Sequence, residues 1–330
     1  MTPRPPLDPE LAAAWRARPG LTSLLPEQIG DVRAAEPAPT RIDPDTDVTG
    51  FDASTHRVPG APGGPEVDLL LLRPRDHPGP VPCLYHLHGG GLIAGTRWDD
   101  VVPLLELARD TGCAIASAEY RLAPEHPYPA ALEDATAGLR WLVGRAADLA
   151  LDPGAIVIEG ISGGGGLAAA TALWIRDHGG PRLLGQLLIC PMLDDRNDSP
   201  SARQMAGHGS WDRTANATAW EAYLGDAVGG SEVPAYAAAA RSADLRGLPP
   251  TFLDVGSAET FRDEVIRYAD RLWQAGGDAE LHVWPGAFHG FDYAVPEAAV
   301  SRAARAARTN WLTRLLARRP LVGTPGGTRP

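Results

Sequence analysis

Residues 157–170 read Val157-Ile158-Glu159-Gly160-Ile161-Ser162-Gly163-Gly164-Gly165-Gly166-Leu167-Ala168-Ala169-Ala170, and this stretch decides the fold. It passes from an apolar run typical of a buried strand, through a glycine cluster, into an alanine-rich pattern typical of a helix. Ser162 lies at the apex of this strand-turn-helix. Gly160 and Gly164 suit a turn so tight that a side chain would collide with the strand or the helix. We therefore expect the Ser162 hydroxyl to be exposed at the start of a helix.

A glycine-rich turn in this place has two known uses. It can hold the phosphates of a dinucleotide, or it can present a nucleophilic serine with an oxyanion-binding N–H group on the next residue, here Gly163. The stretch does not keep the G-x-G-x-x-G spacing of dinucleotide folds, and no strong ribose-binding acid follows it. The turn alone still leaves open a purely structural role.

The flanking sequence alternates short apolar runs with longer amphipathic stretches, which is typical of an α/β fold with a mostly parallel sheet. The near-continuous apolar character of the runs favours parallel strands covered on both faces over half-exposed antiparallel ones. The predicted strands are Val67 to Arg73, Pro82 to Leu87, Cys113 to Glu119, Ala155 to Glu159, Gly185 to Cys190, Thr251 to Val255 and Glu280 to Trp284. The predicted helices are Leu11 to Arg18, Val101 to Thr111, Pro129 to Ala147, Gly165 to His178, Arg262 to Ala275 and Glu297 to Ala317.

Two stretches fall outside this alternation. Residues 1–45 are rich in Pro and Ala, and residues 197–245 form a long insert between two strands. We expect a core of residues 46–196 and 246–320, covered by a cap built from these two segments, with a disordered tail at 321–330. The insert carries aromatic residues that either line a substrate pocket or only fix the insert to the core, namely Trp211, Trp220, Tyr223 and Tyr236.

Composition excludes several classes of partner. The 330 residues carry a formal net charge of -11 with scattered Lys and Arg, which disfavours nucleic acid and anionic membrane surfaces. No apolar run is long enough for a secretory signal or a membrane span, so a cytoplasmic protein is expected. Cys83, Cys113 and Cys190 lie in apolar strand-like runs, and an odd count there indicates core packing without disulfides.

A second motif lies upstream of the turn. His88-Gly89-Gly90-Gly91 follows the strand 82–87, and its glycines allow backbone N–H groups to converge on one point. Then comes Tyr120-Arg121-Leu122-Ala123-Pro124-Glu125-His126-Pro127-Tyr128-Pro129-Ala130-Ala131. Together with the turn at Ser162, these motifs resemble the hormone-sensitive-lipase family of esterases, from about residue 80 to 293.

The resemblance implies an α/β-hydrolase fold with an eight-stranded, mostly parallel sheet and a helical cap. It implies short- to medium-chain acyl esters as substrates and an oxyanion hole made by Gly90, Gly91 and Gly163. The stretch 120–125 would brace the oxyanion loop and the turn. The family often has Asp before the serine and Ala after it, where this chain has Ile161 and Gly163, so the pocket shape and the acyl preference do not follow from the resemblance.

The base and the acid are expected downstream. His289 follows the last predicted strand between small and aromatic residues, which matches the family's histidine loop and the order serine, acid, histidine. Aligned with the family pattern, the acid falls on Glu259. Asp263 is the principal alternative and Asp254 a third, while His282 and His126 are expected to be packing residues.

The sequence thus predicts an esterase that acts through a Ser162, His289 and Glu259 triad and an acyl-enzyme intermediate, with no cofactor and no metal. Its partner would be a small ester, and a homodimer is compatible with the sequence. Two alternatives use the same scaffold: an elimination or lactone-forming enzyme, and a ligand-binding protein.

Overall fold

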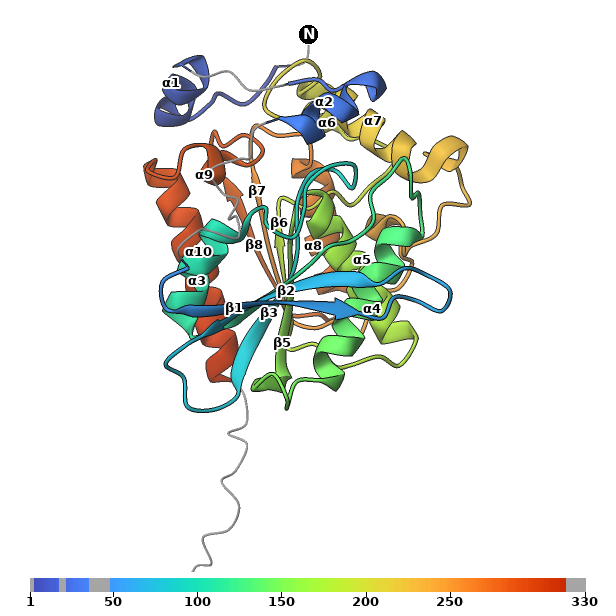
Figure 1. Ribbon diagram of the computed structural model, residues 1–330. Helices are drawn as coiled ribbons and strands as arrows, with labels where there is room; N and C mark the ends of the chain where they lie inside the picture. The colour runs from blue at the N-terminus through green and yellow to red at the C-terminus, as the bar shows by residue number, and fades with distance from the viewer. Residues whose placement is uncertain (1–2, 18–21, 36–47, 319–330) are drawn as a thin grey trace, which may run out of the picture.

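The computed structural model describes residues 3–17, 22–35 and 48–318, and Figure 1 shows their arrangement. Eight strands form one sheet in the order β1-β2-β4-β3-β5-β6-β7-β8. From β4 to β8 all neighbours are parallel, whereas β2 pairs antiparallel with both β1 and β4. The strands are β1 (Phe51–Val58), β2 (Val67–Pro74), β3 (Val81–Leu87), β4 (Ala114–Ala118), β5 (Leu151–Ile161), β6 (Gly185–Ile189), β7 (Thr251–Gly256) and β8 (Ala279–Trp284).

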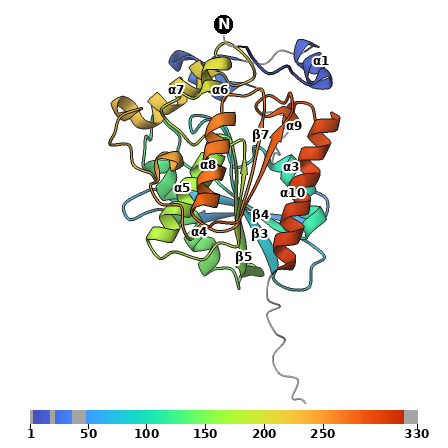
Figure 2. The ribbon, with the colours of Figure 1, turned by 180° about the vertical axis from the view of Figure 1, so that it is seen from behind.

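Helices cover both faces of the sheet (Figures 1 and 2). On one face α4 (Ala130–Gly144), α5 (Gly163–Asp177) and α8 (Arg262–Gln274) enclose the larger apolar core. On the other face α3 (Val101–Thr111) and α10 (Ala299–Ala317) enclose a second core. This double cover explains why the central strands are apolar on both faces, and the predicted eight-stranded α/β sheet is confirmed.

The sequence pattern was wrong about one pair of strands. It missed β1, since this edge strand buries only its end residues Phe51 and Val58 and therefore lacks an apolar run. It also placed β2 among parallel strands, because residues 69–72 are all buried. The apolar run in β2 arises because both faces of the strand are buried, and burial on both faces occurs in antiparallel as well as parallel strands.

The remaining elements gather over one end of the sheet (Figure 1). Thr218 Oγ1 on α7 donates to Leu24 O at 2.7 Å, which joins the N-terminal segment to the insert. These elements are α1 (Pro9–Ala17), η1 (Pro26–Gln28), α2 (Ile29–Ala34), α6 (Pro200–Gln204), α7 (Arg213–Leu224), η2 (Gly225–Ala227) and α9 (Phe291–Ala294). The short helix η3 (Ala239–Arg241) instead packs against α5. The predicted tail 321–330 lies outside the described residues. No helix among those described combines the length and the apolar character needed to cross a membrane.

Candidate active site

The turn at Ser162 is as tight as its glycines indicate. Ser162 has φ 56° and ψ −120°, and α5 begins at the next residue, two positions before the predicted start. A Cβ on Gly160 would lie 2.3 Å from Gly164 O, and one on Gly164 would lie 2.0 Å from Leu87 O. Side chains at these positions would therefore push the helix away from the sheet.

Three side chains form a continuous hydrogen-bonded line. Ser162 Oγ lies 2.9 Å from His289 Nε2, and His289 Nδ1 lies 3.0 Å from Glu259 Oε1. Ser162 follows β5, Glu259 follows β7 and His289 follows β8, so parallel strands bring the three residues to one edge of the sheet. Glu259 is 2% exposed and the His289 side chain 12%, so this line is largely shielded from water.

Neighbouring residues fix the orientation of the acid and the base. Glu259 Oε2 accepts a hydrogen bond from Gly256 N–H at 2.8 Å, which leaves Oε1 for the imidazole. The Ser210 hydroxyl donates to His289 O, and the Phe261 ring meets the imidazole edge-on at 5.1 Å between centroids. The carboxylate and the ring are therefore held in their orientations from several sides.

The other acids considered from the sequence have different partners. Asp263 Oδ2 accepts from Ser201 N–H at 2.8 Å. Asp254 lies inside the fold and pairs with Arg308 at 2.8 Å. Glu259 is therefore the acid that the fold brings to His289. Of the other two histidines, His282 lies in β8 beside Glu280, and the His126 N–H donates to Leu122 O.

The loop after β3 lies against the start of α5. Gly90 and Gly91 have positive φ angles of 102° and 62°. A Cβ on Gly163 would lie 2.8 Å from Gly91 N and 2.8 Å from Leu92 N. The first N–H groups of a helix have no partner within the helix, so the N–H of Gly163 is available beside this loop. The three predicted oxyanion residues therefore lie together.

Buried polar groups support this loop. Gly89 N–H donates to Asp100 Oδ2 at 2.8 Å, and the Tyr120 hydroxyl donates to His88 O at 2.7 Å. Tyr120 also stacks on the His88 ring at 4.1 Å, which agrees with the bracing role inferred for its stretch. Burial lowers the pKa of His88 to about 3, so the ring is neutral. Burial raises the pKa of Asp100 to about 6.

Sequence reasoning missed a second polar pair beneath the loop. His86 Nδ1 lies 2.5 Å from Glu159 Oε2, and both side chains are fully buried. Burial opposes the charged imidazole, yet the adjacent Glu159 carboxylate outweighs it and raises the pKa of His86. Both residues lie in apolar strands, so only the pairing of β3 with β5 brings them together.

One of the four insert aromatics reaches the site. A Cβ on Gly91 would lie 2.7 Å from the Trp211 ring, and this ring is 6.4 Å from His289 between centroids. Trp220 and Tyr223 are instead buried in the larger core, and the Tyr236 hydroxyl donates to Asp177 at 2.9 Å. Of the four insert aromatics, Trp211 therefore lies at the site and the other three fix the insert to the core.

Cys190 also lies beside the line, which the sequence did not indicate. It directly follows β6 with a φ of 36° and is 5% exposed. Burial raises the pKa of its thiol, and the nearby carboxylate of Glu259 acts in the same direction. All three cysteines are buried, as their apolar surroundings in the sequence predict.

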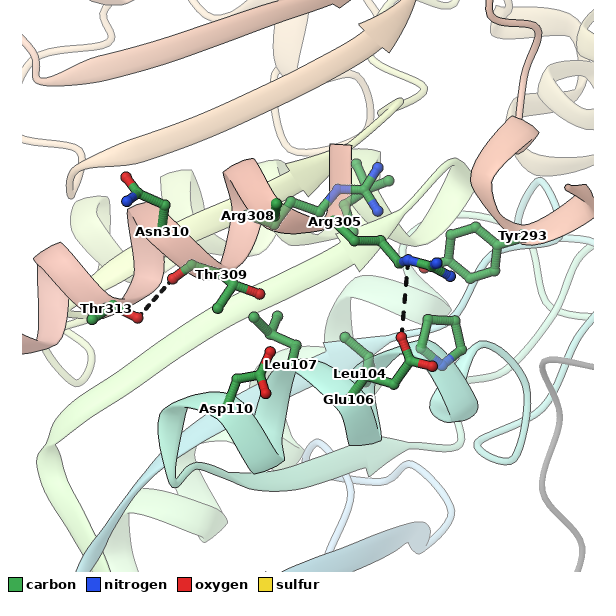
Figure 3. A pocket seen from close by; sticks show the side chains of 13 residues that line it. Leu104, Glu106, Leu107, Asp110, Tyr293, Arg305, Arg308, Thr309, Asn310 and Thr313 are labelled. Atoms are coloured by element: carbon green, nitrogen blue, oxygen red, sulfur yellow. Dashed lines mark hydrogen bonds and ion pairs between the residues drawn. The ribbon is translucent and has the colours of Figure 1, made fainter. Parts of the chain in front are cut away.

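Five cavities in the described part of the chain are lined by residues other than Ser162, Glu259 and His289. One of about 490 Å³ separates α3 from α10, where Arg305 faces Glu106 at 3.9 Å (Figure 3). None of Ser162, Glu259 and His289 lines it. Another of about 460 Å³ borders Ala258 and Phe288, the neighbours of the acid and the base.

Known proteins share this architecture. A family model described as α/β hydrolase fold matches residues 84–293. The esterase LipI of Mycobacterium tuberculosis is 31% identical over 276 residues, which cover 79% of this chain and 86% of that protein. The carboxylesterase NlhH of the same species is 36% identical over 228 residues, which cover 66% and 70%. The structure of a bacterial heroin esterase is similar, with a TM-score of 0.87, 37% identity and coverage of 94% and 98%.

These similarities extend over the strands, the glycine loop and the turn that place the hydrogen-bonded line. They agree with the resemblance that the motifs indicated. The chain therefore belongs to the α/β-hydrolase family of esterases related to hormone-sensitive lipase, and it is itself an esterase.

Proposed function

We propose that the chain hydrolyses short- to medium-chain acyl esters, with Ser162 as nucleophile, His289 as general base and Glu259 as the acid that orients the base. The observation that carries this proposal is the line from Ser162 Oγ through His289 to Glu259, with separations of 2.9 and 3.0 Å. A serine hydroxyl needs such a base, and an imidazole needs such an acceptor to hold its tautomer.

The proposed reaction is acyl transfer in two steps. With the proton of His289 on Nδ1 and donated to Glu259, Nε2 accepts the Ser162 proton as Oγ attacks the ester carbonyl. The imidazolium then gives this proton to the leaving alcohol, and an acyl-Ser162 remains. Water, deprotonated by Nε2, attacks the acyl group and releases the carboxylic acid.

Gly90, Gly91 and Gly163 would stabilise both tetrahedral intermediates. Their backbone N–H groups are fixed by the loop and the helix start, so they need no reorganisation when negative charge develops. Loss of one such donor lowers kcat by about 10² to 10³ in other enzymes. The underlying polar pairs, Gly89 with Asp100 and His88 with Tyr120, support their placement.

The burial of Ser162 and the position of Trp211 support the short acyl range in this proposal. Ser162 is 6% exposed, and the Trp211 ring lies against Gly91 above the proposed oxyanion hole. In this proposal the Trp211 ring limits the length of acyl chain that can lie beside the nucleophile. Acetyl and butyryl esters are therefore the expected substrates, with longer chains limited by Trp211.

A p-nitrophenyl ester series from acetate to palmitate tests this function. We expect turnover to be greatest with short chains and to fall by a factor of about 10³ or more in Ser162→Ala. Ser54→Ala, which changes an exposed serine on β1, is the matched control. A fluorophosphonate should label wild type and the control but not Ser162→Ala. Absence of both turnover and labelling in the wild type would favour the elimination or ligand-binding alternatives.

A second comparison tests the acid. Glu259→Gln keeps the size of the side chain but loses the charge that favours imidazolium, and kcat should fall by about 10³ to 10⁴. Asp263→Asn should stay within about tenfold of wild type, because Asp263 hydrogen-bonds Ser201 rather than His289. The reverse order of effects would assign the acid to Asp263.

A further inference from the structure

Cys190 brings a third metal-ligating side chain to the proposed acid and base. Among the residues that the structure describes, one group of His, Cys, Asp and Glu has its ligand atoms close together, namely Cys190, Glu259 and His289. Its ligand atoms all lie within 4.8 Å of one another. The esterase mechanism uses the acid and the base but gives the thiol no role.

We propose that Cys190, Glu259 and His289 form a site for a thiophilic divalent cation such as Zn²⁺ or Cd²⁺, and that an ion bound there inhibits the esterase. The inhibitory part rests on the proposed function, whereas the binding part does not. The site takes one sulfur, one nitrogen and one oxygen ligand from loops after β6, β8 and β7.

The spacing of the three ligand atoms can be compared with that in a tetrahedral zinc centre. With Zn–S near ~2.3 Å and Zn–N and Zn–O near ~2.1 Å, ligand atoms in a tetrahedron are about 3.3 to 3.6 Å apart. His289 Nδ1 and Glu259 Oε1 already lie 3.0 Å apart. Side-chain adjustments of about 1 Å would bring the three ligand atoms, now within 4.8 Å of one another, to these separations.

The donor set also selects the ion. A thiolate and an imidazole favour zinc, cadmium and similar ions, whereas magnesium and calcium require oxygen ligands. The thiolate and the carboxylate together carry two negative charges, which a divalent cation neutralises. Such neutrality matters because Cys190 and Glu259 are 5% and 2% exposed, and an uncompensated charge at such a position is costly.

A bound cation would inhibit the enzyme because it changes which nitrogen of His289 carries the proton. In the free enzyme Nδ1 carries the proton and Nε2 accepts from Ser162. A cation on Nδ1 takes the place of that proton, which moves to Nε2, while the Cys190 thiol releases its own proton to solvent. Nε2 then carries a hydrogen and no longer accepts the Ser162 proton. The cation also engages Glu259, so the base loses both its function and its partner.

The test uses full-length protein freed of metal by a chelator. ZnCl₂ is titrated against p-nitrophenyl acetate turnover in wild type, Cys190→Ala and the matched control Cys113→Ala, each relative to its own metal-free rate. We expect the zinc inhibition constant to rise at least about tenfold in Cys190→Ala and to remain unchanged in the control, because one ligand is lost. Equal zinc sensitivity in wild type and Cys190→Ala would overturn the proposal.

A second measurement does not depend on turnover. Co²⁺ bound to a thiolate gives a charge-transfer band in the near ultraviolet, and this band should appear in wild type and Ser162→Ala but not in Cys190→Ala or Cys190→Ser. A wild type without the band refutes the site even if the variants fail to fold. If the band appears as expected but wild type hydrolyses no ester, the proposed function fails and the cation site remains.

Discussion

Replacement of Gly163 by Ala tests how closely the oxyanion loop approaches the helix start. The added Cβ would lie 2.8 Å from Gly91 Cα, Gly91 N and Leu92 N. These are backbone atoms, so no flexible side chain can move aside. The loop itself must shift, although it is held by Asp100 and Tyr120 through Gly89 N–H and His88 O.

The size of the effect follows from the distances. Ordinary contacts of a Cβ begin at 3.4 Å, and the difference from 2.8 Å requires a shift of about 0.6 Å in the loop. A misplacement of about 1 Å costs about 10² in rate, and loss of one oxyanion donor costs about 10² to 10³. We therefore expect kcat to fall by about 10 to 10². KM should change less, because the donors act on charge that develops in the transition state.

Steady-state kinetics with p-nitrophenyl acetate measures both constants, and Gly144→Ala in α4 provides the control. A Cβ on Gly144 meets nothing within 4 Å, so this variant should keep its kcat and gain up to about 1 kcal/mol of stability from the helix preference of Ala. A kcat of Gly163→Ala within about twofold of wild type would refute the contact between loop and helix as the basis of the oxyanion hole.

Three further changes test other parts of the structure. Asp100→Asn removes a carboxyl whose pKa is raised by burial to about 6. As pH rises from about 4 to 8, the free energy of unfolding of the wild type should therefore fall by up to about 3 kcal/mol relative to that of the variant. A difference in unfolding free energy between the two proteins that stays the same at all pH values in urea would contradict this. Arg308→Leu leaves the buried Asp292 and Asp254 carboxylates unpaired and should cost about 3 to 5 kcal/mol in urea unfolding, whereas a loss below about 1 kcal/mol would show that the network contributes little. Trp211→Ala should raise kcat/KM for the octanoate ester relative to acetate by about tenfold or more, and an unchanged ratio would exclude Trp211 as the limit on acyl length.

The sign of the Asp100 effect follows from the direction of its pKa shift. The folded state binds the proton more tightly than the unfolded state, so protonation stabilises the fold and deprotonation destabilises it. The extra stability is present at pH values below the unfolded pKa and disappears as pH rises to about 6 and beyond. The amide introduced by Asp100→Asn keeps an oxygen acceptor for Gly89 N–H, so the variant tests the charge rather than the hydrogen bond.

The sequence by itself determined most of the secondary structure and the tight turn at Ser162. Strand and helix positions follow from hydrophobic periodicity, and the conformation at Ser162 follows from glycines at fixed spacing. The motifs predicted Ser162 and His289 at the ends of parallel strands, whereas the choice of Glu259 over Asp263 rested on the family resemblance. The edge strand β1 was missed because only its end residues are buried, so its sequence shows no apolar run.

Only the tertiary structure decided which polar residues share a site. His86 and Glu159 meet through strand pairing, and Trp211 alone among the insert aromatics reaches the oxyanion loop. Cys190 is one of three cysteines in similar apolar runs, yet it alone joins Glu259 and His289 in a cluster within the described part of the chain. Distances between residues far apart in sequence depend on the register of the sheet and on loop conformation, which apolar periodicity does not encode.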